Sequence, residues 1–306
     1  MLASVTVRAP AKVNLALHVG PPRADGFHGV ATVFHAVSLY DDLVATPLRT
    51  GAGMQLHIEG EGAGTLPLDS TNLAAQAALA LVPFGASPDV SLVIHKGIPV
   101  AGGLAGGSAD AAAALVAVDA LFELGLSRET LLEIATGLGS DVPFALTGGT
   151  AIGHDRGNEL TSVLVRGTFH WVLVFAEGGL STPAVYRESD RLRGADVAEP
   201  EVPAAMLQAL AAGDVATLGR SLSNDLQPAA VSLRPQLAHV LSAGEEYGAL
   251  GGVVSGSGPT CAFLARDDEH ALDLAVAFTA SGVCRTVKRS HGPVAGARVV
   301  EHRVAH

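Results

Sequence analysis

The most informative stretch of the chain is Pro99-Val-Ala-Gly-Gly-Leu-Ala-Gly-Gly-Ser-Ala-Asp110, which runs into small apolar residues. Its four glycines allow left-handed backbone angles and let a ligand come close to the N–H groups. We expect a buried helix to start at Ser108 or Ala109, and the unpaired N–H groups at such a start attract anions, most often phosphates. A strand expected over residues 89–95 precedes the loop, which is the order that a phosphate site needs.

Two common glycine motifs are absent from this loop. No Lys-Ser or Lys-Thr pair follows the glycines, so it is not a Walker A loop, and the spacing differs from the Gly-x-Gly-x-x-Gly dinucleotide fingerprint. The alternative without a ligand is a flexible loop beside an alanine-rich core helix. Because four glycines in one short loop are costly to order, the sequence favours a phosphate site.

The composition indicates a large core and an acidic chain. The 306 residues are enough for two domains, and 48% of them are hydrophobic against 16% charged, so disorder is not expected. The net charge of −11 argues against nucleic acid or an anionic membrane as a partner, because both require a basic face. A polyanionic small molecule must therefore meet local positive groups. We expect a monomer or a homodimer.

Cysteine and histidine usage predicts neither a disulfide scaffold nor a structural zinc site. Cys261 lies in an apolar run and is expected to be a buried strand thiol, and it forms no Cys-x-x-Cys motif with Cys284. The 12 histidines show no compact ligand spacing. The first residues read as a strand and not as a signal peptide, and the longest apolar run, 111–118, is too short for a bilayer. We expect a cytoplasmic protein.

Residues 12–19 alternate between apolar and polar side chains, as in a strand with one core face. Lys12, Asn14 and His18 share the polar face, which is either an ordinary solvated surface or the wall of a cleft. Lysine is rare in this arginine-rich chain, and both Lys12 and Lys96 adjoin polar or glycine-rich segments. This pattern arises by chance or reflects a need for a compact ammonium, which a planar guanidinium does not replace.

Two further segments carry candidate site residues. Asp25-Gly26 predicts a turn, which places Phe27 and His28 at its tip, where they either hold a planar ring or simply pack and solvate. Asp141 precedes Val-Pro at a helix entrance. It is either an N-cap, a carboxylate aimed at a substrate, or both.

The order of expected elements indicates an α+β chain in two parts. We expect strands over 30–39, 42–46 and 54–59, and a boundary near the polar turn that begins at Asp155. The second part contains another glycine-rich turn, Gly251-Gly-Val-Val-Ser-Gly-Ser-Gly-Pro259. Its order of strand, helices, strand, helix and strand is typical of an α+β domain.

With these pieces placed, the sequence resembles the GHMP kinase superfamily. The motifs that carry the resemblance are Ala9-Pro-Ala-Lys-Val-Asn-Leu15, Pro99-x-x-x-Gly103-Leu104 with Gly106-Gly-Ser-Ala109, and Gly256-Ser-Gly-Pro259. Within the superfamily, Arg23-Ala-Asp-Gly-Phe-His28 and Gly139-Ser-Asp-Val-Pro143 point to members that act on a nucleotide-linked alcohol. Three motifs in the right order are specific, although each one alone is weak.

The resemblance implies a fold and an activity. The fold is an N-terminal ribosomal-protein-S5-like α/β domain, residues 1–161, and a C-terminal ferredoxin-like domain, residues 162–306, with the active site between them. The activity is ATP-dependent phosphorylation of the 2-hydroxyl of 4-diphosphocytidyl-2-C-methyl-D-erythritol in the non-mevalonate isoprenoid route. The cofactors implied are ATP and Mg²⁺, and Ser108 is a candidate for the metal, whose protein ligands are otherwise not evident.

The resemblance also assigns residues. It makes Lys12 and Asp141 the catalytic pair, with Asp141 as the base. Phe27 stands where the family often has Tyr, so the ring is kept for stacking and a hydroxyl is lost. The substrate side comprises Asn14, Phe27, His28, Thr182 and Tyr186. The nucleotide side comprises Lys96, Pro99, Val100, Ala101, Gly102, Gly103, Leu104, Ala105, Gly106, Gly107, Ser108 and Ala109.

Two alternatives remain open from the sequence. The first is another GHMP kinase with a mevalonate-type or sugar substrate, against which the segment from Asp25 to His28 argues. The second is a nucleotide-binding homologue without catalysis, against which the presence of both Lys12 and Asp141 argues. Nucleic-acid binding would rest on likeness of fold alone, and the net charge of −11 opposes it.

Overall fold

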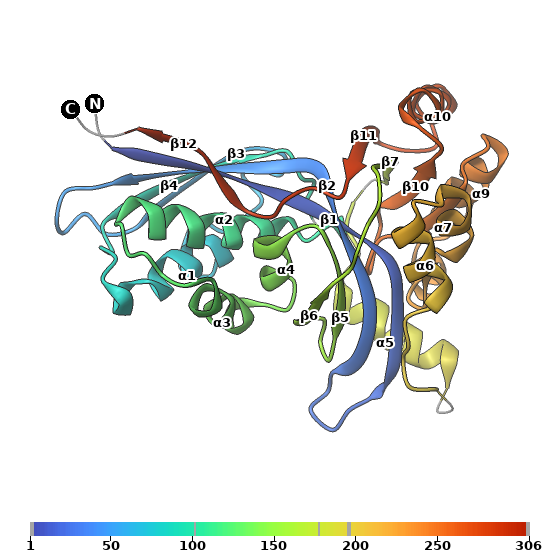
Figure 1. Cartoon of the computed structure of the whole chain (residues 1–306), viewed down its shortest axis with the longest axis horizontal. Coiled ribbons are helices and arrows are strands. Elements are labelled where there is room, and N and C mark those ends of the chain that lie inside the picture. Colours follow the sequence, from blue (N-terminus) through green and yellow to red (C-terminus); the bar gives the residue numbers. More distant parts are fainter. Residues whose placement is uncertain (1–2, 101, 177, 195–196, 304–306) are drawn as a thin grey trace.

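A computed structural model describes residues 3–100, 102–176, 178–194 and 197–303. Its longest elements are the antiparallel strands β1 (Ser4–Pro22) and β2 (His28–Pro47), whose far ends project from the body of the molecule as a hairpin (Figure 1). The prediction of separate strands over 30–39 and 42–46 was wrong, because β2 is continuous. Its polar residues do not end the strand: Asp42 pairs with Arg8, and Asp41 pairs with Lys96.

The first sheet runs in the order β12-β1-β2-β4-β3, with β5 on β2, β6 on β5 and the short β8 on β1. Helices α1 to α4 cover one face of this sheet (Figure 1). The further elements of this part are β3 (Gln55–Gly60), α1 (Leu73–Ala80), the 3₁₀ helix η1 (Val82–Phe84), β4 (Val90–Lys96), α2 (Gly106–Leu121), α3 (Arg128–Leu138), α4 (Val142–Thr147), β5 (Thr150–His154) and β6 (Glu159–Ser162).

Helix α2 is the central helix of this layer and the one that the glycine loop enters. It begins at Gly106, not at Ser108 or Ala109 as predicted, because Ala105 takes a left-handed conformation with φ 58° and turns the chain into the helix early. Alanines on nearly every side of α2 are buried. Small side chains let α2 lie close to β1, β2 and α1 at once, which fixes the helix start against the sheet.

The second sheet has the order β11-β7-β10-β9, and all its described pairings are antiparallel. Helical segments follow its first strand, and α10 lies between its third and fourth, which gives the predicted ferredoxin-like arrangement. The elements are β7 (Phe169–Phe175), α5 (Thr182–Arg193), α6 (Ala204–Ala212), α7 (Val215–Ser221), β8 (Ser223–Asn224), α8 (Gln227–Leu233), α9 (Gln236–Glu246), β9 (Gly251–Val254), β10 (Cys261–Ala265), α10 (Asp268–Ser281), β11 (Thr286–Gly292) and β12 (Arg298–Arg303).

The chain crosses between the two parts more often than the predicted division at residue 161 implies. β12 returns to the first sheet and pairs with β1, although it lies at the far end of the sequence (Figure 1). The dividing position itself falls inside β6. The elements β6, α8 and β9 were not predicted. β6 falls at the expected boundary turn and β9 in the expected glycine-rich turn, and no separate element was expected over residues 227–233.

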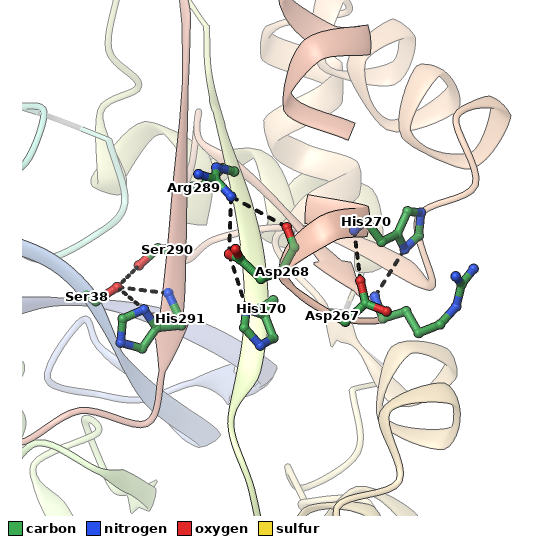
Figure 2. A network of polar contacts seen from close by, with 9 residues as sticks. Ser38, His170, Asp267, Asp268, His270, Arg289, Ser290 and His291 are labelled. Atoms are coloured by element: carbon green, nitrogen blue, oxygen red, sulfur yellow. Dashed lines mark hydrogen bonds and ion pairs between the residues drawn. The ribbon is translucent and has the colours of Figure 1, made fainter. Parts of the chain in front are cut away.

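Polar contacts also join the two sheets directly (Figure 2). The Ser38 hydroxyl on β2 contacts Ser290 at 3.2 Å and accepts a hydrogen bond from the His291 backbone N–H at 2.9 Å, both on β11. On the other side of β11, Arg289 donates to Asp268 at the start of α10 at 3.2 Å. The Ser38 contacts place the second sheet against the middle of the long hairpin, while the Arg289–Asp268 contact fastens α10 to β11 within the second part.

Two further expectations from the sequence concern a cysteine and membrane-spanning helices. Cys261 is fully buried in β10, as predicted for a strand thiol, and burial raises the pKa of its thiol to about 12. Among the described residues, we find no helix that combines the length and the apolar character needed to cross a membrane.

His35 is the buried titratable residue at the junction of the two sheets. Its Nδ1 lies 2.8 Å from the Thr150 hydroxyl, and its ring sits 5.9 Å from the Trp171 ring. Burial lowers its pKa from 6.5 to about 3, against a smaller opposite effect of the Gly292 backbone. The imidazole is therefore neutral in the folded protein above about pH 3.

We expect His35 to make the protein acid-sensitive. Below pH 6.5 the unfolded chain binds a proton that the folded chain does not accept until about pH 3. Through this window the group lowers the free energy of unfolding by up to about 1.4 kcal/mol per pH unit as the pH falls. His35→Gln should flatten the pH dependence of the urea midpoint between pH 7 and pH 4. Equal slopes for the two proteins would contradict the assignment.

Candidate active site

Lys12 and Asp141 face each other across the mouth of the glycine loop, as the resemblance implied. The Lys12 Nζ atom lies 3.7 Å from Asp141 Oδ2 and 2.5 Å from Asn14 Oδ1. Asn14 in turn donates to the Thr32 hydroxyl at 2.8 Å, which orients its amide. Burial lowers the pKa of Lys12, and the charge of Asp141 partly offsets this effect. The ammonium is therefore held rigidly on the β1 face with one carboxylate beside it.

Asp141 occupies the N-cap position of α4 but does not act as a cap. Its side chain accepts no hydrogen bond from the helix, and its backbone has helical angles of φ −90° and ψ −10°. The carboxylate is 32% exposed, while the Lys12 side chain is only 7% exposed. The capping interpretation was therefore wrong, and the carboxylate is left available to a ligand.

A cavity of about 480 Å³, the loop cavity, opens in front of the glycine loop. Lys12, Asn14, Asp141, Thr182 and Tyr186 all line it. The predicted phosphate-loop residues that line it are Pro99, Val100, Gly102, Gly103, Ala105, Gly106 and Gly107.

Three described loop residues do not line the loop cavity. Leu104 and Ala109 are buried in the core, so their side chains serve packing, and Ser108 stands on α2 away from the lining. Ala101, also assigned to the nucleotide, lies outside the described residues. The nucleotide assignment of Ala101, Leu104, Ser108 and Ala109 stays a prediction.

The second glycine-rich turn, residues 251–259, packs against the phosphate loop and holds its backbone. Gly103 has φ 76°, and a Cβ added to it would lie 2.1 Å from the Ser255 carbonyl oxygen. Ser255 donates its hydroxyl to the Gly103 carbonyl at 3.1 Å, and the Thr260 N–H donates to Gly102 at 3.3 Å. Gly256, Ser257 and Gly258 also line the loop cavity. The shape of the phosphate loop therefore depends on a segment from the other part of the chain.

Lys96 lines the loop cavity, but its ammonium is occupied by two carboxylates. It donates to Asp41 Oδ2 and to Asp110 Oδ2, each at 2.6 Å, and is nearly fully buried. Burial lowers the pKa of Lys96, but the two carboxylates outweigh it and raise the value. Burial and the charge of Asp41 raise the pKa of Asp110, and the Lys96 ammonium opposes this rise. Lys96 is thus first a structural ion pair, and its predicted contact with the nucleotide stays a prediction.

A second cavity of about 370 Å³, the hairpin cavity, lies between the hairpin tip and α5. Phe27 and His28 line it, together with Tyr186 from α5. His28 Nε2 lies 2.8 Å from Asp190, and its ring is 5.1 Å from the Tyr186 ring. Burial and the nearby carboxylates of Asp141 and Asp190 raise the pKa of Tyr186 to about 12. The cavity is an aromatic slot whose phenol keeps its proton.

Two family models match the chain. The one described as GHMP kinases N terminal domain covers residues 72–149, and the one described as GHMP kinases C terminal covers residues 206–284. The chain belongs to the GHMP kinase family. The predicted family and two-part α+β fold are thereby confirmed. The activity class, an ATP-dependent kinase of a small molecule, is confirmed as well, because the relatives described next are named kinases.

Several curated relatives at 55–57% identity share a single name. The proteins named 4-diphosphocytidyl-2-C-methyl-D-erythritol kinase include one from Streptomyces coelicolor, 57% identical over 97% of this chain and 100% of its own length. They also include one from Thermobifida fusca, 56% identical over 97% of this chain and 98% of its own length. A further one, from Mycobacterium tuberculosis, is 56% identical over 97% of this chain and 93% of its own length.

Solved structures of family members have the same fold. A 4-(cytidine 5'-diphospho)-2C-methyl-D-erythritol kinase matches with a TM-score of 0.77 and 34% identity, over 94% of this chain and 98% of the other. Homoserine kinase from Cytophaga hutchinsonii matches with a TM-score of 0.74 at 20% identity, over 97% of each chain. The second similarity supports the fold alone.

Sequence reasoning missed several residues at this family's cleft. Thr32 orients Asn14, and Arg156 lines both cavities. Thr32 lies on the neighbouring strand, where its register partner is Leu17, so nothing in the local sequence links it to Asn14. Arg156 stood in a segment that was predicted only to be a boundary turn. His18, on the same strand face as Lys12, lines neither cavity and instead lies 3.4 Å from Asp225.

Proposed function

We propose that the protein transfers the γ-phosphoryl group of ATP to the 2-hydroxyl of 4-diphosphocytidyl-2-C-methyl-D-erythritol. The observation that carries the proposal is the Lys12–Asp141 pair, which lines the cavity of the glycine loop next to a second, aromatic cavity that shares part of its wall. The name shared by relatives that are 55–57% identical over nearly the whole chain supports the substrate. In this proposal ATP binds in the loop cavity and the cytidine binds in the hairpin cavity.

The loop side of the cleft suits the phosphates of ATP. The start of α2 presents backbone N–H groups without a partner in the helix, and the helix dipole is positive at this end. Gly106 and Gly107 line the cavity there, so no Cβ blocks an approaching phosphate. Phosphoryl transfer needs alignment and charge stabilisation more than covalent help from the protein, and this loop supplies both.

The Lys12–Asp141 pair suits the attacking alcohol. In the proposed reaction the hydroxyl oxygen forms a bond to the γ-phosphorus, the bond to the β,γ-bridging oxygen breaks, and ADP leaves. Asp141 orients the hydroxyl and accepts its proton, which moves late because an alcohol is a far weaker acid than a carboxylic acid. The buried ammonium of Lys12 stabilises negative charge that develops on the transferring group.

The chain also offers one carboxylate oxygen that fits a magnesium ion. Asp110 lies on the first turns of α2 and lines the loop cavity. Its Oδ1 atom is buried and has no hydrogen-bond partner among the described residues. The described residues contain no group of three His, Cys, Asp or Glu residues that could hold a metal ion by itself. Mg²⁺ on ATP, however, needs only one or two carboxylates besides phosphate oxygens. Asp110 would hold the ion, which supplies charge neutralisation on the phosphates.

The test is ADP release with Mg-ATP and a panel of alcohols. The panel contains the cytidine diphosphate compound, the same alcohol without its nucleotide, mevalonate and homoserine. We expect turnover with the first and at least about 100-fold lower kcat/KM with each of the others, since the hairpin cavity is then empty. Preferred turnover of mevalonate or a sugar would replace this proposal with another GHMP kinase activity, and no ADP release at all would indicate a homologue without catalysis.

The same proposal sets the location and the assembly. Both ATP and a nucleotide-linked biosynthetic intermediate are metabolites of the cytoplasm, so we place the protein there. One chain carries Lys12, Asp141 and both cavities. A monomer is therefore sufficient for the proposed reaction.

A further inference from the structure

The two cavities meet at a short stretch of shared wall. Val30, Ser140, Arg156, Thr182 and Tyr186 line both of them. The aromatic slot that fits a base lies on one side, and the Lys12–Asp141 pair lies on the other. A nucleotide-linked alcohol that reaches both must lay its linker along this shared wall. In the proposed substrate the linker is a diphosphate, and it carries most of the negative charge.

Positive charge along this path is scarce. Among the described residues, the cations that line either cavity are Lys12, Lys96, Arg156 and Arg187. Lys12 pairs with Asp141, and Lys96 is shared by two buried carboxylates. Arg187 lines the hairpin cavity but not the loop cavity, whereas Arg156 lines both cavities. Since the chain has a net charge of −11, the overall field does not attract a dianion, and a local cation must do so.

The backbone that carries Arg156 is fixed to the hairpin tip. Its neighbour Asp155 has φ 61°, a region that residues with a side chain seldom occupy. The Val30 N–H donates to the Asp155 carbonyl at 2.8 Å, and the Arg23 guanidinium pairs with the Asp155 carboxylate. Strained backbone of this kind persists when its surroundings hold it, and it is frequent at ligand sites.

Among the residues that the structure describes, the contacts that hold the Arg156 guanidinium are weak. Arg156 Nη2 donates to Asp25 Oδ2 at 2.9 Å, and its Cζ lies 3.9 Å from the centre of the Phe27 ring. Both charged side chains are more than 40% exposed, and exposed ion pairs contribute little. A bidentate contact with a phosphate is stronger than either of these contacts. The side chain is thus pre-positioned beside the path and easily released to a ligand.

We infer that Arg156 recognises the diphosphate linker of the nucleotide-linked alcohol, at the junction of the two cavities. The inference rests on the proposed function and adds a specificity-determining residue to it. It predicts a contact with substrate oxygens that ATP does not share, because the ATP phosphates lie at the start of α2.

The test is Arg156→Gln, which removes the charge and keeps most of the aliphatic stem. We expect KM for the cytidine diphosphate compound to rise by about 10-fold to 100-fold, with KM for ATP unchanged and kcat altered by less than about 3-fold. Inhibition by CDP should weaken by the same factor, whereas inhibition by cytidine, which has no phosphate, should stay the same. The matched control is Arg191→Gln, an exposed arginine of α5 that pairs with Glu188 and lines neither cavity.

Each outcome decides one question. If the wild-type protein does not phosphorylate the cytidine diphosphate compound, the proposed function fails and Arg156 is not at issue. If the wild type does so and Arg156→Gln leaves KM and CDP inhibition unchanged, only the role of Arg156 is wrong. Equal weakening of CDP and cytidine would also overturn it, since that result means Arg156 merely supports the Phe27 ring.

Discussion

Asp141→Asn should lower kcat by about 10²-fold to 10⁴-fold while ATP still binds. The substitution removes the negative charge that accepts the proton of the hydroxyl and keeps the size of the side chain. It also removes the counter-charge that partly offsets the effect of burial on Lys12, so the pKa of Lys12 should fall further. Turnover is measured as ADP release, and ATP binding is measured separately by calorimetry.

The fold of this variant should be intact, because Asp141 contributes little to it. The carboxylate is 32% exposed, lies 3.7 Å from Lys12 and forms no cap hydrogen bond, so we expect a loss of stability below about 1 kcal/mol. The matched control is Asp214→Ala. Asp214 is a true N-cap, accepting from the Thr217 N–H at 3.0 Å, and its removal should lower the Tm without changing kcat. Turnover of Asp141→Asn at the wild-type rate would remove Asp141 from the role of base.

The parts of the site that the sequence predicted are those that local chemistry determines. Glycines before an alanine-rich run identify the loop and show that a buried helix follows it, whatever the rest of the chain does. The alternation from Lys12 onward predicts a strand with Lys12 and Asn14 on one face, and the structure has it. The meeting of Lys12 with Asp141 came from the resemblance alone, since nothing near either residue specifies a partner so far along the chain.

What local reasoning missed depends on the register between distant strands. Lys96 was assigned to the nucleotide, but its position opposite Asp41 on β2 gives it a buried counter-ion before any ligand arrives. β12 pairs with β1, and nothing in the sequence of β12 indicates which strand it pairs with. Arg156 reaches the cleft because β5 pairs with β2 beside the hairpin tip. In each case the local sequence carries no distinctive signal, and the residue that lies opposite on the neighbouring strand determines what the segment does.

The boundary of α2 was misplaced for a different reason. Sequence reasoning treated Gly106 and Gly107 as loop residues because glycine is a poor helix former. The structure places both in the first turn, where the missing side chains leave the cavity open. Here the requirement for close approach of a ligand outweighs helix propensity, as is common at functional sites.

Gly103→Ala should be the most damaging single-methyl change in the loop. The residue has φ 76°, and the new Cβ would lie 2.1 Å from the Ser255 carbonyl and 3.1 Å from the Gly258 backbone nitrogen. Both neighbours are backbone atoms, so the phosphate loop must move. Strain and overlap together should cost about 2–5 kcal/mol of stability. We expect KM for ATP to rise by more than about 100-fold, measured beside the urea midpoint of the same preparation.

Two further variants keep this test decisive if Gly103→Ala does not fold. Ser255→Ala removes the 3.1 Å hydrogen bond to the Gly103 carbonyl and leaves every backbone atom in place, so it should raise KM for ATP by about 3-fold to 10-fold in a folded protein. Gly137→Ala lies in α3 with no atom within 4 Å of the added Cβ, and it should leave KM unchanged and raise stability slightly. The phosphate loop takes its shape from the second glycine-rich turn only if Ser255→Ala weakens ATP binding and Gly137→Ala does not. Unchanged ATP binding in Ser255→Ala would mean that the loop holds its shape alone, and that the two glycine segments are neighbours without dependence.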